Sequence, residues 1–206
     1  MLTLHIAPKT CALASLIALE ESGLRFDVRG VDFASSEQQS PGYLAINPKG
    51  RVPALVTDRG VLTETPAILA YVAQITPGGR LAPLDDAFAF ARMQAFNSYL
   101  CSTVHVAHAH SRRGARWSDD PAAVETMKAK VPQNMAECFR LIEEMMLTGP
   151  WVMGAAYSVA DPYLFTIGGW LKGDGVDPAL FPKVAEHRAR MLERPAVKRA
   201  LERAEA

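Results

Sequence analysis

The chain has 206 residues and carries 22 basic and 22 acidic side chains, so its formal net charge is zero. Apolar residues make up 49% of it and charged residues 21%, a composition typical of globular proteins that excludes a disordered chain. Because there is no basic surplus, we expect no nucleic-acid partner.

The first eight residues contain no basic stretch followed by a long apolar run. We therefore expect neither a signal peptide nor a membrane span, no membrane partner, and a cytoplasmic location. The three cysteines, Cys11, Cys101 and Cys138, are an odd number at wide spacings. This argues against a disulfide framework and favours a reducing compartment.

The N-terminal third alternates between strand and helix patterns. Apolar and polar residues alternate over residues 2–7, which predicts a strand, and apolar residues recur at helical spacing over 11–22 before Gly23. Residues 26–31 predict a second strand. Because a helix joins these two strands, we expect them to pair in parallel.

A turn at residues 47–50 leads to two short predicted strands, 54–57 and 61–63. The tight connection between them, which contains a glycine, predicts an antiparallel hairpin. Thr65 is then predicted to be the N-cap of a helix that Pro66 opens and that runs to residue 75. Residues 1–77 are thus expected to form an α/β domain of order βαβ-ββα with a mixed sheet.

Helical patterns dominate after the break at residues 76–79. Residues 158–161 resemble a capping box, in which Ser158 and Asp161 fix the start of a helix that is apolar almost all round. We expect an all-α domain over residues 86–206, with helices at 86–113, 121–147, 158–172, 178–193 and 195–204.

Cys11 is the first candidate for chemistry. It stands at the head of a predicted helix, where free amide donors and the helix dipole favour a thiolate, although a buried, inert thiol is the alternative. The sequence Cys11-Ala12-Leu13-Ala14 has no second cysteine three residues on, which argues against a dithiol oxidoreductase. A single thiol there is suited to meeting another sulfur, through a mixed disulfide or a hydrogen bond.

Two other segments suit peptide binding. If the Val52–Pro53 bond is cis, Val52 exposes both backbone groups to an extended peptide; the alternative is a simple turn proline. Glu64 and Thr65 place a carboxylate beside a hydroxyl and helix N-terminal amides, a combination that suits an α-amino acid end. Alternatively, Thr65 only caps the helix and Glu64 is a solvated charge.

The region 105–116 is rich in histidine and arginine. His105 and His108 share a helix face, but no cysteine or carboxylate stands at ligand spacing nearby, so we expect no metal. Arg112, Arg113 and Arg116 are either a solvated helix end or a basic cluster that faces a cleft and holds an anionic substrate.

Together these segments resemble the cytosolic glutathione transferase family, most of all its bacterial beta class. The resemblance covers nearly the whole chain and implies a thioredoxin-like N-terminal domain, an all-helical C-terminal domain and a homodimer. It is carried by Pro8-Lys9-Thr10-Cys11-Ala12-Leu13-Ala14, Asn47-Pro48-Lys49-Gly50-Arg51-Val52-Pro53-Ala54-Leu55, Leu62-Thr63-Glu64-Thr65-Pro66-Ala67-Ile68 and Ser158-Val159-Ala160-Asp161-Pro162-Tyr163-Leu164-Phe165.

The resemblance also implies roles for individual residues. Cys11, with Thr10 and His105, is expected beside the glutathione sulfur as the catalytic group. Asn97 and Ser98 are expected as contacts to glutathione across the dimer. The predicted electrophile pocket includes Ile6, Val106 and His108. The predicted glutathione-binding residues are Cys11, Arg51, Val52, cis-Pro53, Glu64, Thr65, Ser98 and His105.

The sequence departs from the beta-class pattern at three places. Val106 stands where a lysine commonly follows the active-site histidine, and His5-Ile6 replaces an early aromatic residue. The loop 34–38 is usually basic in this class, but here it contains no basic residue. These changes weaken the expected hold on the glycyl carboxylate of glutathione.

Three functions remain open at this point. The first is a transferase that conjugates glutathione, as co-substrate, to a small apolar electrophile. The second is glutathione-dependent thiol-disulfide exchange through Cys11. The third is a non-catalytic protein that stores apolar ligands on the same scaffold.

Overall fold

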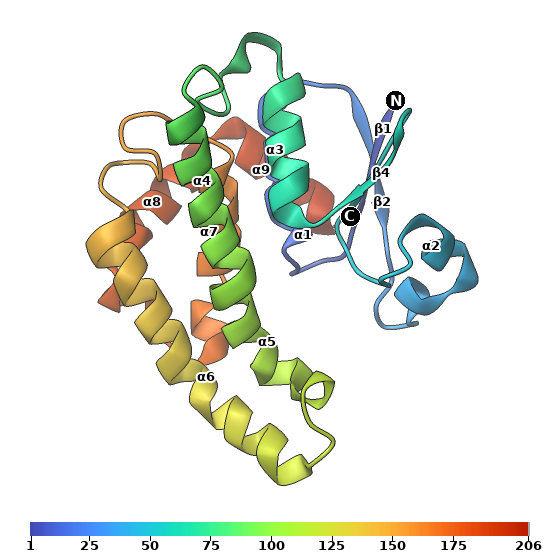
Figure 1. Cartoon of the computed structure of the whole chain (residues 1–206), viewed down its shortest axis with the longest axis vertical. Helices are drawn as coiled ribbons and strands as arrows, with labels where there is room; N and C mark the ends of the chain where they lie inside the picture. Colours follow the sequence, from blue (N-terminus) through green and yellow to red (C-terminus); the bar gives the residue numbers. More distant parts are fainter. Residues whose placement is uncertain (206) are drawn as a thin grey trace.

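The computed structural model describes residues 1–205; Ala206, with which the expected helical domain ends, lies outside them. A four-stranded sheet with helices on both faces forms the N-terminal part, and helices alone form the rest (Figure 1). The predicted fold class is thereby confirmed.

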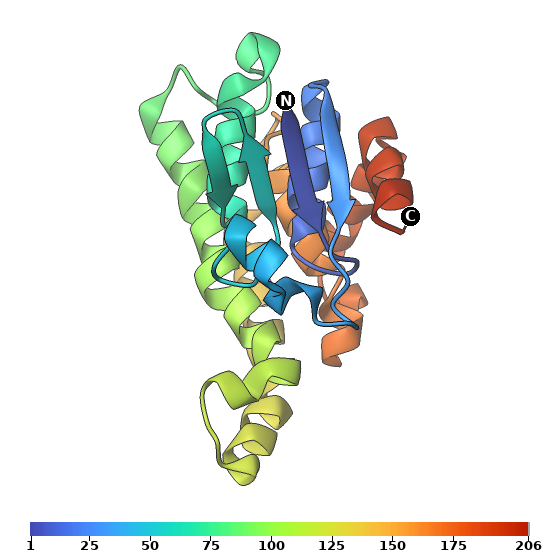
Figure 2. The ribbon, with the colours of Figure 1, turned by 90° about the vertical axis from the view of Figure 1, so that its right-hand side faces the viewer.

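The sheet has the strand order β2-β1-β3-β4, and Figure 2 shows the four strands side by side. Strand β1 (Leu2–Ile6) pairs in parallel with β2 (Phe26–Gly30), as the crossover through a helix predicts. Strand β3 (Ala54–Thr57) pairs antiparallel with β1, with Leu4 opposite Leu55. Strand β4 (Gly60–Thr63) completes the predicted hairpin.

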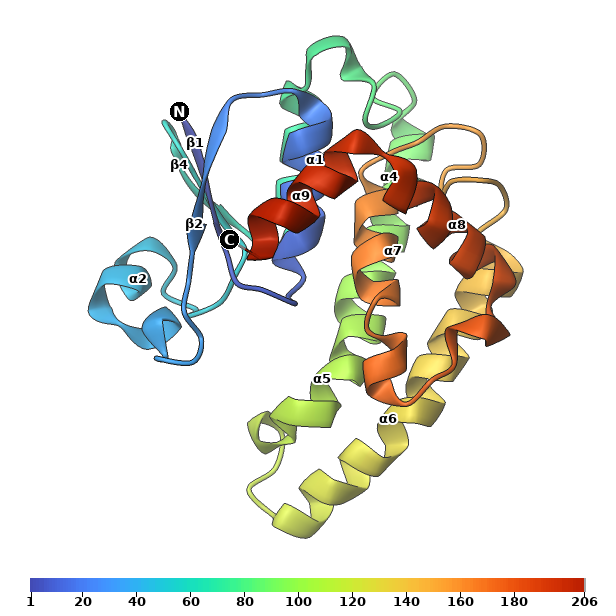
Figure 3. The ribbon, with the colours of Figure 1, turned by 180° about the vertical axis from the view of Figure 1, so that it is seen from behind.

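Two helices cover one face of the sheet and a short one lies over the other (Figures 1 and 3). Helix α1 (Ala12–Ser22) ends at Gly23, whose φ of 72° is the left-handed conformation that glycine adopts freely. Helix α3 (Thr65–Ile75) lies beside α1, and α2 (Pro41–Ile46) lies on the opposite side of the sheet.

The start of α3 differs from the prediction. Glu64, not Thr65, is the N-cap residue, with φ 71° and ψ 120°, and its side chain makes no capping hydrogen bond. Thr65 and Pro66 therefore occupy the first two helical positions. The prediction that Thr65 caps the helix is wrong because the chain turns from β4 into the helix at Glu64, one residue earlier.

The expected helix 86–113 is a continuous rod with an irregular middle. Between α4 (Ala87–Tyr99) and α5 (His105–Arg113) lies the π-helical segment η3 (Leu100–Val104), where the His105 amide donates to the Leu100 carbonyl five residues back. The remaining segments are η1 (Glu37–Gln39), η2 (Pro77–Gly79), η4 (Gly114–Arg116), α6 (Pro121–Leu141), η5 (Ile142–Met146), α7 (Ala160–Gly168), η6 (Leu171–Asp174), η7 (Pro178–Leu180), α8 (Pro182–Glu193) and α9 (Pro195–Glu205). None of the helices within residues 1–205 combines the length and the apolar character needed to cross a bilayer.

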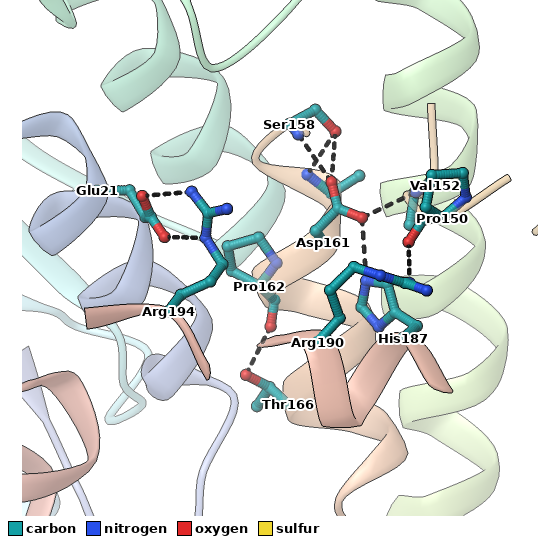
Figure 4. A network of polar contacts seen from close by, with 11 residues as sticks. Glu21, Pro150, Val152, Ser158, Asp161, Pro162, Thr166, His187, Arg190 and Arg194 are labelled. Carbon is teal, nitrogen blue, oxygen red and sulfur yellow. Dashed lines mark hydrogen bonds and ion pairs between the residues drawn. The ribbon is translucent and has the colours of Figure 1, made fainter. Parts of the chain in front are cut away.

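The start of α7 is held by one buried carboxylate (Figure 4). Asp161 is fully buried, and its Oδ2 accepts from the Ser158 amide at 2.7 Å while its Oδ1 accepts from the Val152 amide at 2.8 Å. His187 Nε2 donates to the same Oδ1 at 3.0 Å, and the Ser158 hydroxyl accepts from the Ala160 amide at 3.3 Å. The N-cap residue is Val159, one position after Ser158, but Ser158 and Asp161 fix the start of the helix as predicted.

Helix α9 returns to the N-terminal part and packs on α1 (Figure 3). Arg194 is the single residue between α8 and α9. Its guanidinium forms a bidentate ion pair with the Glu21 carboxylate of α1, with N–O distances of 2.5 and 2.9 Å (Figure 4). Arg199 and Arg203 of α9 both bind Glu20. The last helix thus ties the helical part to the sheet through α1, which also packs on α7.

Candidate functional site

The loop between β1 and α1 places Cys11 and Thr10. The Thr10 hydroxyl donates to the Ala7 carbonyl at 2.7 Å and accepts from the Ala12 amide at 3.3 Å. The Leu13 amide donates to the Thr10 carbonyl, and the Ala14 amide to the Cys11 carbonyl. The first amides of α1 are therefore directed to oxygen atoms and not to the Cys11 sulfur.

The Cys11 thiol faces the turn that precedes β3. Its Sγ donates to the Val52 carbonyl at 3.7 Å, and the residue is 9% exposed. Burial raises the pKa of the Cys11 thiol, and the Thr65 hydroxyl and the positive charge of Arg113 only partly offset this. Burial, the carbonyl acceptor and the helix amides already bonded to oxygen atoms thus favour the alternative, a buried neutral thiol, over a thiolate at the helix head.

The turn at residues 47–53 is fixed from within the N-terminal domain. The Val52–Pro53 bond is cis, as the resemblance implies, and both residues are buried. The Tyr43 hydroxyl and the Asn47 side-chain amide both donate to the Arg51 carbonyl, at 2.7 and 2.6 Å. These bonds hold Val52 opposite Cys11 and leave the Arg51 side chain exposed.

Glu64 and Thr65 occupy the end of β4 and the start of α3. Thr65 is buried, and a hydrogen bond between its hydroxyl and the Cys11 thiol acts to lower the pKa of that thiol. Glu64 is exposed and pairs with the Lys49 ammonium, which also donates to the Thr63 hydroxyl at 2.6 Å. Lys49 was not among the predicted site residues, although it lies within the segment 47–55 that carries the family resemblance.

His105, on α5, faces an arginine and a tryptophan. Arg113 Nη2 donates to His105 Nε2 at 3.1 Å, and Trp170 meets the His105 ring edge-on with centroids 4.9 Å apart. Burial, followed by the charges of Arg113, His108, Arg51 and Arg116, lowers the pKa of His105 to about 3. His105 is therefore a neutral imidazole whose Nε2 accepts, because an arginine can only donate.

His108 contacts the same tryptophan, and its ring lies beside that of His105, with centroids 6.2 Å apart. Its ring stacks on Trp170 at a centroid distance of 4.2 Å, and its Nδ1 lies 2.7 Å from Oδ2 of the buried Asp174. The sequence showed no carboxylate at nearby spacing, since Asp174 lies 66 residues further along the chain. Trp170 was missed for the same reason, whereas the contact of Arg113 with His105 joins two residues of one helix, eight positions apart.

The other predicted site residues lie further apart. Ile6 is 3% exposed and belongs to the core, whereas Val106 is 36% exposed. Ser98 is exposed, whereas Asn97 is fully buried within the chain. His5 packs edge-on against Tyr43 of α2, with ring centroids 5.8 Å apart.

The described residues contain no group of three or more histidine, cysteine, aspartate or glutamate side chains arranged to hold a metal ion. The positive charge of Arg113, which donates to His105 on α5, acts on the Cys11 thiol of the N-terminal part. This arrangement brings a thiol, a hydroxyl and a guanidinium together between the two parts of the chain.

Comparison with known proteins identifies the family. The family described as "Glutathione S-transferase, N-terminal domain" matches residues 1–74. The chain is 32% identical to glutathione S-transferase GstA of Escherichia coli O157:H7, over 96% of both chains. It belongs to the glutathione S-transferase family.

Solved glutathione S-transferase structures agree with this assignment. A glutathione transferase homologue from Sulfitobacter, solved with bound glutathione, is 48% identical with a TM-score of 0.95, and 98% of each chain is covered. The bacterial beta-class glutathione S-transferase of Sphingomonas chungbukensis is 34% identical with a TM-score of 0.85, again over 98% of each chain. The resemblance drawn from the sequence is confirmed at the level of the family.

Proposed function

We propose that the protein binds glutathione in its N-terminal domain, residues 1–77, and transfers the glutathione sulfur to an apolar electrophile held against the helical domain, residues 86–206. The observation that carries this proposal is the meeting of Cys11, Val52 and Thr65 at one point, in a chain 48% identical to a protein solved with bound glutathione. Glutathione is the co-substrate, and the proposal requires no metal.

The binding groups follow the shape of a tripeptide. The backbone of Val52 is available to an extended cysteinyl unit, and its carbonyl already accepts a thiol proton from Cys11. Thr65 and the first amides of α3 suit the carboxylate of the γ-glutamyl end, and Glu64 suits its ammonium. Lys49 now neutralises Glu64, so the ligand ammonium takes the place of the lysine in that ion pair.

The conjugation step needs a glutathione thiolate. The thiol loses its proton to solvent, the sulfur attacks the electrophilic carbon, and the leaving group departs with its bonding electrons. Cys11 has a raised pKa and so keeps its proton, which suits it to donate a hydrogen bond to the glutathione sulfur. Arg113 adds a positive charge beside that position. These features support conjugation over attack by Cys11 itself.

The assembly and location follow the family. We propose a homodimer in which Ser98 of one chain reaches the glutathione of the other. A mass in solution of twice 22.4 kDa is the expected result of light scattering. The three cysteines are unpaired, which supports a reducing, cytoplasmic compartment.

The test combines titration with glutathione and conjugation of 1-chloro-2,4-dinitrobenzene, using wild type, Cys11→Ala and the control Cys138→Ala, which removes another buried thiol. We expect both variants to bind glutathione and Cys11→Ala to lose roughly tenfold in kcat, the effect of one hydrogen bond to a charged group. Glutathione held covalently on Cys11, with all turnover lost in Cys11→Ala, would establish thiol exchange instead. A folded protein that neither binds nor conjugates glutathione refutes the proposal.

A further inference from the structure

A cavity of about 520 Å³ lies between the sheet and α2, and its volume is within the range of small-molecule sites. Its floor is formed by three neighbouring strands, through Thr3 and His5 of β1, Arg29 of β2 and Val56 of β3. The strand register places these residues side by side, because His5 is paired with Arg29 and Thr3 with Val56. Figures 1 and 3 show α2 on the opposite side of the sheet from α1 and α3.

Helix α2 and the segment before it form the roof, which internal contacts hold in place. The Tyr43 ring meets the His5 ring edge-on, with centroids 5.8 Å apart, and the Tyr43 hydroxyl donates to the Arg51 carbonyl at 2.7 Å. The Tyr43 amide donates to the Ser40 hydroxyl at 3.2 Å, which caps the helix. Ile46 of the same helix also lines the cavity. The cavity is therefore preformed, with an aromatic and aliphatic wall.

Two charged side chains line the cavity without pairing with each other. Within residues 1–205, Arg29 forms no ion pair, although its strand partner His5 lies directly beside it. Glu37 Oε2 instead accepts from the Asp32 amide at 2.7 Å, within its own loop. Burial and the charge of Arg29 lower the pKa of His5, so its imidazole is neutral at pH 7. The cavity thus offers one guanidinium that has no carboxylate partner in the protein.

We propose that this cavity binds an aromatic monocarboxylate, whose carboxylate pairs with Arg29 and whose ring packs against the Tyr43 and His5 rings. The planar donors of a guanidinium match a carboxylate in pairs, and aromatic rings favour edge-to-face contact. A second negative charge on the ligand would meet Glu37, which favours a monoanion.

The proposed site is separate from the one that holds glutathione. Cys11, Val52 and Thr65 lie outside the lining of the cavity, and no step of the conjugation uses it. The inference therefore goes beyond the proposed function and does not depend on it.

The test titrates the protein with 2-naphthoate and with its neutral counterpart 2-naphthamide by calorimetry, in the absence and in the presence of S-hexylglutathione. We expect one 2-naphthoate per chain under both conditions. The amide should bind at least about tenfold more weakly, because it loses one charge-assisted hydrogen bond. Raising the NaCl concentration should weaken binding of the acid and leave that of the amide unchanged.

The variants place the ligand in the cavity. Arg29→Gln should weaken binding of 2-naphthoate at least about tenfold and leave the amide unaffected. Conjugation of glutathione by this variant should equal that of wild type. Ile46→Trp fills the cavity with a large ring and should abolish binding of both compounds. The matched control is Arg25→Gln, because Arg25 is exposed and stands just before the same strand but does not line the cavity. It should bind as wild type.

Several results would overturn the inference while leaving the proposed function intact. These are no binding of 2-naphthoate, equal affinities for the acid and the amide, or an unchanged affinity in an Arg29→Gln protein whose circular dichroism matches wild type. Displacement of 2-naphthoate by S-hexylglutathione also overturns it, because the acid then occupies the electrophile site. Absence of glutathione binding, with 2-naphthoate still bound through Arg29, would refute the proposed function and support this inference.

Discussion

Cys11 carries its proton because of what surrounds it. The sulfur donates to the Val52 carbonyl, while the amides that could have stabilised a thiolate are bonded to the oxygens of Thr10 and Cys11. A cysteine in such surroundings is a hydrogen-bond donor first and a nucleophile only in alkaline solution.

Alkylation of Cys11 by iodoacetamide should reflect this. Because burial raises the thiol pKa above its ordinary value of 9.0, we expect the rate to increase steadily with pH up to and beyond pH 9. Mass spectrometry of the peptide that contains Cys11 gives the rate. A rate that levels off between pH 6 and 8 would show a thiolate at neutral pH and contradict the assigned hydrogen bond.

His105 should make the fold sensitive to acid. Its pKa is about 3 in the folded state and near 6.5 when unfolded, so the unfolded chain binds more protons between these values. Wild type should therefore lose stability as pH falls from 6.5 towards 3, by at most about 1.4 kcal/mol per pH unit from this residue. The His105→Gln variant has no titrating group at this position, so its stability should not show this part of the loss.

Urea unfolding of wild type and His105→Gln at pH 7.5 and pH 5.0 measures the difference. The advantage of wild type over the variant should be smaller at pH 5.0. An advantage that is the same at both pH values would show that His105 is not held neutral. His110→Gln, on the same helix, is a suitable control.

Among single residues, the sequence could predict those site candidates whose position depends on local backbone structure. Cys11, Val52, Glu64 and Thr65 stand at strand ends and turns, whose positions can be read from the chain. The contact of His108 with Asp174, by contrast, arises only when α5 packs against the segment that follows α7. No short-range spacing carries that information.

Among the elements, α7 depends most on a single side chain. Asp161→Ala removes the acceptor for the Val152 and Ser158 amides and for His187 at a fully buried position. Leaving these donors unpaired should cost about 3–5 kcal/mol in the free energy of unfolding. Urea denaturation measures this loss.

Asp120→Ala is the matched control, because Asp120 also caps a helix, accepting from the Ala122 amide at 2.9 Å, but at an exposed position. Removing an exposed cap costs about 1 kcal/mol. Equal losses in the two variants would mean that the buried network around Asp161 adds nothing beyond ordinary capping.

The elements themselves were largely predictable. Alternation and turn residues predicted the strands and their pairing, and helical spacing predicted α1 and the long helices. The π-helical segments η3 and η5 were not predicted. Each is only five residues long, which is too short to change the 3.6-residue spacing of apolar positions that predicts a helix. The predicted start of α3 was wrong by one residue. A glutamate gives no indication in the sequence that its backbone will adopt a positive φ, as Glu64 does.

On the scale of the molecule, the last helix decides whether the two parts unfold together. Arg194→Ala removes both bonds to Glu21 and the stacking of the guanidinium on Tyr157, 3.9 Å from the ring centroid. Because the Glu21 side chain is only 11% exposed, we expect a loss of about 1–3 kcal/mol. Arg199→Ala removes a more exposed guanidinium, 52% against 29% for Arg194, and leaves Glu20 paired with Arg203, so it should cost less than about 1 kcal/mol.

Two probes follow the unfolding. The three tryptophans all lie in the helical part of the chain, so their fluorescence follows that part, while far-ultraviolet circular dichroism follows the whole. Coincident transitions are expected in wild type, because α1 packs against both α7 and α9. Separate transitions in wild type would show that the two parts fold independently.

The π-helical segment η3 has a consequence for the direction in which the side chains of α5 point. Its hydrogen bond from His105 to Leu100 spans five residues, one more than in an α-helix. One residue corresponds to about 100° of rotation, so the five residues from Leu100 to Val104 set the angular phase of α5 relative to α4. The direction in which His105 and Arg113 point is therefore decided upstream, by the winding of the rod that carries them.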